Sequence, residues 1–144
     1  MFGSTVYNII RKYDDTVRDS FLEVTHMQAL IENNLGEITI SDRVFQYLVG
    51  IETTNCFGVV GMAFRNKAGD IVKLIVKDSV DKGVLVRLNT ENKLEIELHI
   101  IVEYGVNIPA ITKSIINRVR YFIETTTGFK VENVLVVVDS VRTN

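Results

Sequence analysis

The amino-acid sequence predicts an α/β (α+β) fold, a two-layer sandwich in which two main helices pack against a mixed or mostly antiparallel sheet. Two patterns indicate it. In residues 84–88 and 94–102 every second side chain is apolar, on either side of a turn-rich segment, which is typical of a hairpin with one buried face. Residues 111–123 repeat apolar side chains every three or four positions, which is typical of a one-sided helix. Such helices and such a sheet bury their apolar faces against each other.

An N-terminal amphipathic helical extension is predicted over residues 1–34, ahead of an α/β domain over residues 35–144. Its apolar side chains recur at helical steps, and the candidates for partner contact among them are Val6, Ile10, Tyr13, Val17 and Phe21. Its charges are mixed in sign, whereas a membrane-surface helix is usually basic. We therefore expect it to pack on its own domain or on a second copy. His26–Met27 resembles a cloning junction, which leaves open whether residues 1–26 are native.

The first half of the domain is predicted to begin as strand, helix and strand. Residues 36–40 alternate as a strand does, and Ser41 or Asp42 can cap the helix that follows. In that helix a shared apolar face is expected from Val44, Tyr47, Leu48 and Ile51. An apolar strand starts at Val59, and residues 70–80 are predicted to form a short amphipathic helix.

The second half is predicted to follow the hairpin with a long helix and a last strand. Pro109 suits the first turn of that helix, because proline lacks the amide hydrogen that goes unpaired there. Its apolar stripe consists of Ile111, Ile115, Val119, Phe122 and Ile123. Gly128 suits the left-handed position that ends a helix. Residues 131–138 are rich in β-branched side chains, so they are predicted to be a strand.

Charge and composition argue against several classes of protein. The formal net charge is −2, whereas a nucleic-acid-binding domain usually carries a positive surplus. No apolar run approaches the roughly 20 residues of a membrane-spanning helix. The single cysteine fits a reducing compartment. We therefore expect a cytoplasmic protein that does not insert directly into a membrane.

The residues that carry most enzyme chemistry are few and poorly placed. His26 and His99 lack the spacing of paired metal ligands, so neither a metal nor another cofactor is expected. Cys56 falls at the C-terminal end of a predicted helix, where the helix dipole does not favour a thiolate. His99 falls on a charged strand face with Glu95, Glu97 and Glu103. The sequence therefore predicts a protein that is not an enzyme.

Two segments have a binding alternative beside their structural interpretation. Residues 58–61, Gly-Val-Val-Gly, have the outline of the loop with which KH-type domains clamp a nucleic-acid backbone. The long helix carries Lys113, Arg118 and Arg120, which favour the dipole at a helix C-terminus and could also meet an acidic partner or an anionic membrane surface.

Four ordered segments resemble one family. They are the opening strand and capped helix at residues 36–44, the GVVGM-type segment at residues 56–63, the IVEYG-x-x-IP signature at residues 100–109, and the TGL-x-V-x-x-V close at residues 127–134, where Phe129 stands in place of leucine. Together they are similar to the alkaline shock, or Gls-type general stress, family of Gram-positive bacteria, and most of all to its short housekeeping-type members. In this resemblance the fold-motif residues are Gly58, Gly61, Tyr104, Gly105, Pro109 and Gly128.

The resemblance implies a non-enzymatic cytoplasmic protein linked to cell-envelope stress or lipid-metabolism homeostasis. Its expected partners are proteins, among them a membrane-anchor protein that would hold it at the membrane periphery or a fatty-acid-kinase-like protein. A homo-oligomer is a further expectation. The leading hypothesis is thus an interaction or scaffold module with an exposed apolar or edge-strand surface. A KH-like RNA-binding module is the second hypothesis, and an enzyme using Cys56 or His99 is the third.

Overall fold

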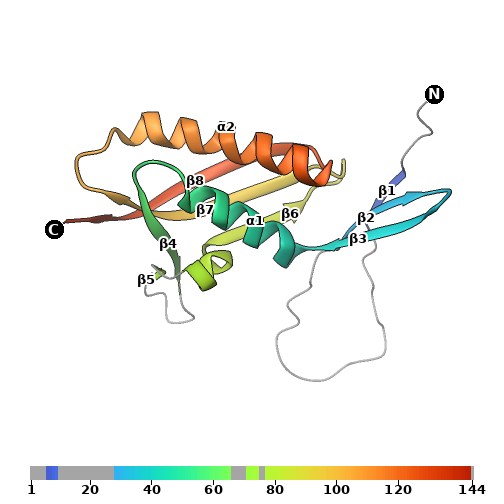
Figure 1. Cartoon of the computed structure of the whole chain (residues 1–144), viewed down its shortest axis with the longest axis horizontal. Helices are drawn as coiled ribbons and strands as arrows, with labels where there is room; N and C mark the ends of the chain where they lie inside the picture. The colour runs from blue at the N-terminus through green and yellow to red at the C-terminus, as the bar shows by residue number, and fades with distance from the viewer. Residues whose placement is uncertain (1–5, 10–27, 66–70, 75–76, 144) are drawn as a thin grey trace, which may run out of the picture.

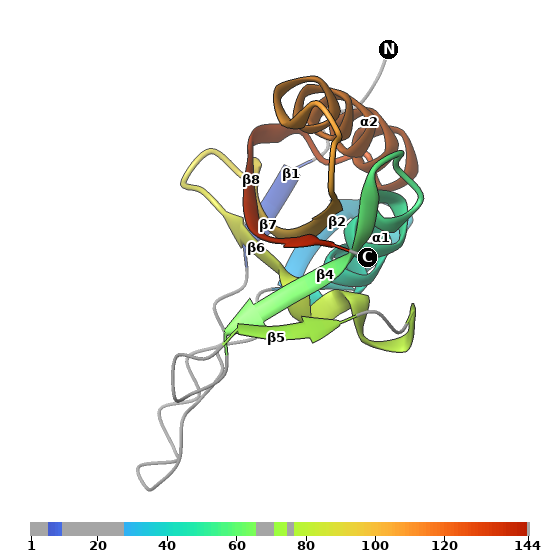
Figure 2. The same cartoon turned by 90° about the vertical axis from the view of Figure 1, so that its left-hand side faces the viewer.

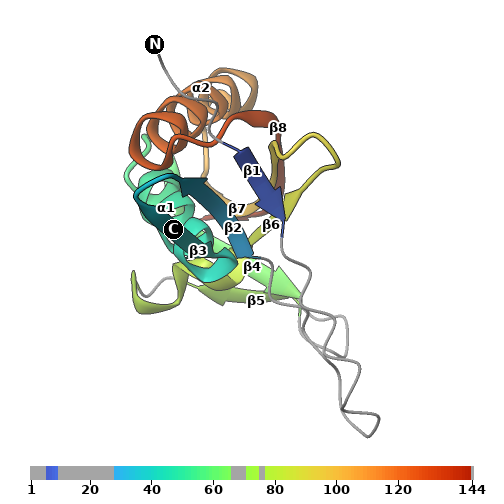
Figure 3. The same cartoon turned by 90° about the vertical axis from the view of Figure 1, so that its right-hand side faces the viewer.

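The computed structural model describes residues 6–9, 28–65, 71–74 and 77–143, and these residues form two sheets and two long helices (Figure 1). The smaller sheet is antiparallel and consists of β1 (Val6–Ile9), β2 (Gln28–Asn33) and β3 (Gly36–Ser41). Figure 3 views the molecule from the end that carries these strands. Asn33 Oδ1 accepts from the amides of Leu35 and Gly36 at 2.9 and 3.1 Å, which closes the β2–β3 turn.

The larger sheet is built around one central strand. It contains β4 (Val59–Arg65), β5 (Ile71–Leu74), β6 (Val84–Leu88), β7 (Leu94–Glu103) and β8 (Val131–Arg142). Antiparallel partners of β7 are β6 along its first half and β4 along its second half, whereas β8 pairs with it in parallel along its full length. Because β8 occupies one edge of β7 throughout, β4 and β6 share the other edge. The sheet is therefore mixed.

Helices α1 (Asp42–Thr54) and α2 (Ile108–Thr127) lie side by side on one face of this sheet (Figure 2). The core between helices and sheet includes Phe45 from α1, Leu98 from β7 and Ile115 from α2, and each of these side chains is fully buried. The rings of Phe45 and Phe129 pack edge to face with centroids 5.7 Å apart. The two-layer sandwich predicted from the sequence is confirmed.

The long helix begins and ends as predicted. Asn107 Oδ1 accepts from the amide of Ala110 at 3.0 Å, and Pro109 lies in the first turn. Gly128 has φ +79° and donates its amide to the carbonyl of Glu124 at 3.1 Å. The predicted stripe is buried at Ile111, Ile115, Val119 and Ile123, and Phe122 packs at its margin. The predicted hairpin is β6–β7, and the predicted last strand is β8, which runs four residues longer than expected.

The predicted N-terminal helix is wrong where the structure describes that region. Val6–Ile9 forms β1, and Gln28–Asn33 forms β2. Val6 and Ile9 pair with Glu32 and Ala29, so cross-strand pairing overrides the helical spacing of the side chains. Residues 10–27, and with them Ile10, Tyr13, Val17 and Phe21, lie outside the described residues. The contact role of these side chains and the division of the chain at residue 35 both remain predictions.

The apolar face predicted for α1 is confirmed only in part, since Leu48 and Ile51 pack against the core and the other two residues do not. The buried face of α1 is made by Phe45, Val49 and Thr53, whereas Val44 and Tyr47 are about half exposed, at 46% and 49%. The helix carries apolar side chains on both of its faces, so spacing alone did not show which one meets the sheet. Ser41 occupies the N-cap position of α1 without a side-chain capping bond.

The short helix predicted over residues 70–80 is strand in its first part. Residues 71–74 form β5, which pairs antiparallel with residues 62–65 of β4, and only the 3₁₀-helix η1 (Lys77–Gly83) is helical. The apolar Ile71 and Val72 suit a strand as well as a helix, and the free edge of β4 decides between the two.

Candidate interaction surfaces

The candidate catalytic histidine is bound on both ring nitrogens by carboxylates of the chain itself. His99 Nδ1 lies 2.7 Å from Asp139 Oδ2, and His99 Nε2 lies 2.9 Å from Glu97 Oε1. The Asp139 side chain is only 6% exposed. Asp139 follows the predicted last strand by a single residue, so no local pattern indicated that it would meet His99. Both ring nitrogens of His99 therefore have carboxylate partners within the chain.

The single thiol is placed unfavourably for nucleophilic chemistry. Cys56 is buried, and its Sγ donates to the carbonyl of Glu52 at 3.4 Å. Burial raises the pKa of the thiol, and the neighbouring Glu52 carboxylate raises it further, while the Arg118 guanidinium opposes both. A raised pKa reduces the thiolate fraction, and the thiolate is the nucleophile. Among the residues that the structure describes, no three His, Cys, Asp or Glu side chains converge as metal ligands.

Two of the three basic residues singled out on α2 have partners within the chain. Arg118 forms an ion pair with Glu52 of α1, so it joins the two helices. Arg120 donates to the carbonyl of Glu132 in β8 at 3.4 Å. Lys113 is exposed near the start of α2. These contacts give Arg118 and Arg120 structural roles, and the partner-contact role of the three residues remains a prediction.

Residues 58–61 do not form the exposed loop that KH-type binding needs. Val59 opens β4, and Gly61 is buried in that strand opposite Ile101. A Cβ at Gly58 would lie 3.3 Å from the side chains of Ile111 and Val106, so this glycine packs against α2. The second hypothesis therefore lacks the loop on which it depended.

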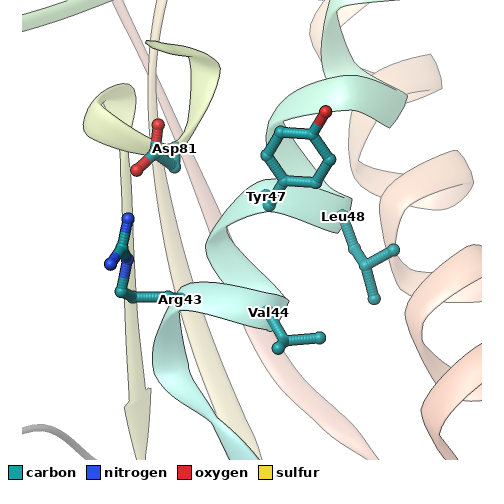
Figure 4. Close-up of a pocket in the computed structure, with 5 residues that line it drawn as sticks. All are labelled: Arg43, Val44, Tyr47, Leu48 and Asp81. Atoms are coloured by element: carbon teal, nitrogen blue, oxygen red, sulfur yellow. The ribbon is translucent and has the colours of Figure 1, made fainter. Parts of the chain in front are cut away.

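Two surface depressions of the described residues are open and shallow. One, with a volume of about 390 Å³, lies between α1 and η1 and is lined by Arg43, Val44, Tyr47, Leu48 and Asp81. Figure 4 shows Arg43 and Tyr47 on α1, with the Arg43 side chain reaching toward Asp81 on η1. The other, of about 170 Å³, lies on the face of the large sheet opposite the helices, beside Leu85 and Leu135. Neither brings together a nucleophile and a base.

At one end of the large sheet the loop before β4 and the loop after β7 lie near the C-terminal strand (Figure 1), and each of these loops carries an exposed aromatic residue. Phe57, in the loop before β4, is 83% exposed, and Tyr104, in the loop after β7, is 75% exposed. The amide of Glu103 donates to the carbonyl of Gly58 at 2.9 Å, which ties the two loops together. We call Phe57, Tyr104 and the partly exposed Ile108 the aromatic patch.

Backbone contacts fix the aromatic patch although its side chains are exposed. The Tyr104 amide donates to the carbonyl of Arg142 at 3.1 Å, so β8 anchors the loop after β7. Gly58 and Gly105 have φ values of +81° and +86°, which glycine adopts without strain. The sequence showed Tyr104 only as part of a family motif. Its exposure excludes it from the core, and an exposed aromatic side chain on a fixed loop is a candidate for binding.

Comparison with known proteins places the chain in a family. Residues 30–143 match the model of the alkaline shock protein 23 family, which is described as having a cell envelope-related function. The chain belongs to the alkaline shock protein 23 family. This confirms the resemblance to alkaline shock and Gls-type proteins.

Relatives in the family come from Gram-positive bacteria. The uncharacterized protein YloU of Bacillus subtilis is 32% identical over 117 residues, 81% of this chain and 97% of the relative. The uncharacterized protein Spy1614 of Streptococcus pyogenes is also 32% identical, over 81% of this chain and 96% of the relative. A stress response regulator gls24 homolog of Streptococcus pyogenes is 30% identical over 75% of this chain and 60% of the relative. No solved structure matches significantly. No helix of the described residues is long and apolar enough to cross a membrane.

Proposed function

We propose that the chain is a non-enzymatic interaction module that serves a cell-envelope-related function through protein–protein contacts made by its aromatic patch. The exposure of Phe57 and Tyr104 on fixed backbone is the observation that carries this proposal. Aromatic side chains dominate the binding energy of protein interfaces, because they bury a large area while losing little conformational freedom. The family's described function supplies the cellular setting.

The patch is suited to binding because it is already ordered. Free loops lose conformational entropy when they bind, and that loss subtracts from affinity. Here the hydrogen bonds from Glu103 to Gly58 and from Tyr104 to Arg142 hold both loops in place before any partner arrives. A partner that covers Phe57 and Tyr104 therefore gains most of the free energy of their burial, on the order of 1.5–3 kcal/mol for each side chain.

The chemistry of the chain supports binding over catalysis. The thiol of Cys56 is buried, and its pKa is raised. The imidazole of His99 has a carboxylate partner at each ring nitrogen. The two depressions beside α1 and on the open sheet face lack converging catalytic groups. These observations favour an interaction role over an enzyme that uses Cys56 or His99.

The partner is proposed to be a protein at the cytoplasmic side of the envelope. A membrane-anchor protein would place the chain at the membrane periphery, and a fatty-acid-kinase-like protein would connect it to lipid metabolism. Both follow from the family resemblance. Either partner would contact the aromatic patch through an apolar surface of its own that has room for two aromatic rings. A cytoplasmic scaffold of this kind needs no cofactor.

The test compares a variant that lacks the aromatic patch with a control variant at an exposed tyrosine elsewhere on the surface. In one variant Phe57→Ser and Tyr104→Ser remove the patch, and in the matched control Tyr121→Ser removes a tyrosine of α2 that is 73% exposed. Each protein is cross-linked in its own host and purified, and the recovered partners are quantified by mass spectrometry. The patch variant should lose a protein that the wild type and the control both recover. Equal recovery by all three proteins, with the patch variant folded by circular dichroism, would exclude the patch as the contact surface.

A further inference from the structure

His99 lies on the face of the large sheet opposite the helices, and carboxylates of very different exposure bind its two ring nitrogens. Nδ1 lies 2.7 Å from Oδ2 of Asp139, and Nε2 lies 2.9 Å from Oε1 of Glu97. The Asp139 side chain is 6% exposed, whereas the Glu97 side chain is 34% exposed. The ring therefore has one partner that the protein encloses and one that water reaches.

A β-bulge in β8 supplies the enclosed carboxylate. Val138 pairs with Ile100 and Ser140 pairs with Ile101, so Asp139 is an extra residue between them. Bulges disrupt the strand ladder locally, and proteins use them to aim a side chain at a site. An ionised carboxylate shielded from water is stable only with hydrogen-bond donors. Asp139 therefore depends on the N–H of Nδ1 far more than Glu97 depends on Nε2.

The two contacts require one hydrogen more than a neutral imidazole and two ionised carboxylates possess. The distances of 2.7 and 2.9 Å are those of hydrogen bonds. An ionised carboxylate only accepts, and a neutral imidazole has one N–H, whereas an imidazolium has two. Both hydrogen bonds therefore exist together only while the cluster binds one extra proton, and loss of that proton removes one of them.

We propose that Asp139, His99 and Glu97 form a pH-sensitive switch that holds the Glu97 side chain against His99 or releases it. With the extra proton bound, His99 donates from Nδ1 to Asp139 and from Nε2 to Glu97. After the proton is lost, the remaining N–H stays on Nδ1, because Asp139 is the partner that water does not solvate. The lone pair of Nε2 then faces the Glu97 carboxylate and repels it, so Glu97 leaves the ring as the pH rises.

Release of Glu97 changes a specific part of the surface. In the strand register Glu97 lies between Leu85 of β6 and Leu135 of β8, and all three line the depression of about 170 Å³ on this face. The two leucines are 45% and 49% exposed. Arg87 lines the same depression, so its guanidinium attracts a released Glu97 carboxylate across the leucines. The switch thus changes the depression from an apolar surface beside Arg87 to one crossed by an ion pair.

The remaining charges of these strands do not take over either contact with the ring. Each of the other ionisable side chains of β6, β7 and β8 has an oppositely charged neighbour of its own: the neighbours are Arg87 and Glu95, Glu103 and Arg142, and Glu132 with Lys93. Residues 59–64 of β4, the strand beside the second half of β7, contain no ionisable side chain. Among the side chains that the structure describes, only Asp139 and Glu97 form hydrogen bonds with the ring. The switch therefore consists of three residues, and it does not depend on the aromatic patch.

Nuclear magnetic resonance on the full chain follows the ring and the depression in one pH titration. His26→Gln leaves His99 as the only histidine, and its ring nitrogens report which of them carries hydrogen. The methyl groups of Leu85 and Leu135 report the depression. As the pH rises, Nε2 should lose its hydrogen while Nδ1 keeps it, and the leucine methyl resonances should move with the same midpoint.

Two matched variants show whether Glu97 is the side chain that moves. The amide of Glu97→Gln donates to an unprotonated Nε2 and accepts from a protonated one, so the ring does not repel it in either state. The pH-dependent movement of the leucine resonances should be lost in this variant. It should be retained in Glu95→Gln, which removes an exposed carboxylate of the same strand that is not bonded to the ring.

Every outcome of the titration decides for or against the switch. Leucine movement that follows the ring and disappears in Glu97→Gln supports it. Leucine resonances that stay fixed while the ring titrates would overturn it, as would loss of the hydrogen from Nδ1 in place of Nε2. A ring that keeps one charge state over the whole pH range in which the protein is folded would also overturn it, and so would leucine movement that persists in Glu97→Gln.

Discussion

Replacing Gly50 with alanine should destabilise the protein, although alanine is the better helix former. Gly50 is buried in α1 where that helix crosses η1. A Cβ built on Gly50 would lie 2.8 Å from the carbonyl oxygen of Val80 and 2.9 Å from its carbonyl carbon and Cγ2. Two of these three atoms belong to the backbone, so a change of rotamer cannot relieve the overlap.

The size of the effect follows from two opposing terms. Alanine in place of glycine within a helix gains up to about 1 kcal/mol from propensity. Forcing an extra carbon into a packed site costs about 1–3 kcal/mol. Val80 is 1% exposed, which leaves η1 little room to move away. We expect a net loss of about 1–2 kcal/mol in the free energy of unfolding, or roughly 2–8 °C in Tm.

Urea unfolding followed by far-ultraviolet circular dichroism measures this change. The variant should unfold at a lower midpoint with an unchanged m-value, as a loss of native stability does. Asn117→Ala, at an exposed position of α2, is the control in which only the propensity gain applies. A Gly50→Ala protein as stable as the wild type would show that α1 and η1 are not in tight contact.

Three other changes have defined outcomes. Ile115→Ala removes a fully buried side chain and should cost about 2–5 kcal/mol of unfolding free energy in the same urea experiment. Gly128→Ala should cost about 1 kcal/mol because its φ of +79° is left-handed, whereas Gly128→Asn should cost less, and an equal loss for both would argue against the backbone as the cause. Iodoacetamide should alkylate native Cys56 at pH 8 more slowly than the urea-unfolded chain, as measured by mass spectrometry, because burial raises the thiol pKa. The raised pKa also makes stability depend on pH. Because the thiol loses its proton at a lower pH in the unfolded chain than in the folded one, the contribution of Cys56 to the free energy of unfolding falls as the pH rises above the unfolded pKa.

The elements that could be predicted from the sequence are those whose local signals agree. In α2, the proline of the first turn, the apolar stripe and Gly128 all indicate one helix, and its bounds follow them closely. In β7, apolar side chains at every second position from Leu94 to Ile100 have a single interpretation, because a shift of one residue would expose that core face.

The elements that could not be predicted depend on contacts distant in sequence. Val6 lies in a strand because β2 offers it an edge, and β2 begins about twenty residues later in the chain. Residues 71–74 extend β4 for the same reason. In α1 both faces are apolar, and only the position of the sheet determines that Phe45 is buried while Tyr47 is half exposed. Local periodicity carries no information about such partners.

The aromatic patch was beyond sequence reasoning for a related reason. Phe57 and Tyr104 are 47 residues apart in the chain, and their loops meet because β4 pairs with β7. An aromatic residue inside a motif otherwise made of strand and helix-start residues gives no sign of its exposure. The bond between Asp139 and His99 depends likewise on the parallel pairing of β7 and β8.

The most direct measurement asks whether contacts or catalysis account for the role of the chain in its host. A strain lacking the protein is complemented with the wild type, with Phe57→Ser plus Tyr104→Ser, or with Cys56→Ala plus His99→Ala, each at equal abundance, and survival under envelope stress is scored. If the chain acts through its aromatic patch, the first double variant fails to restore survival and the second restores it fully. Survival restored by the patch variant and lost in the Cys56 and His99 variant would contradict an interaction role and indicate chemistry at those two residues.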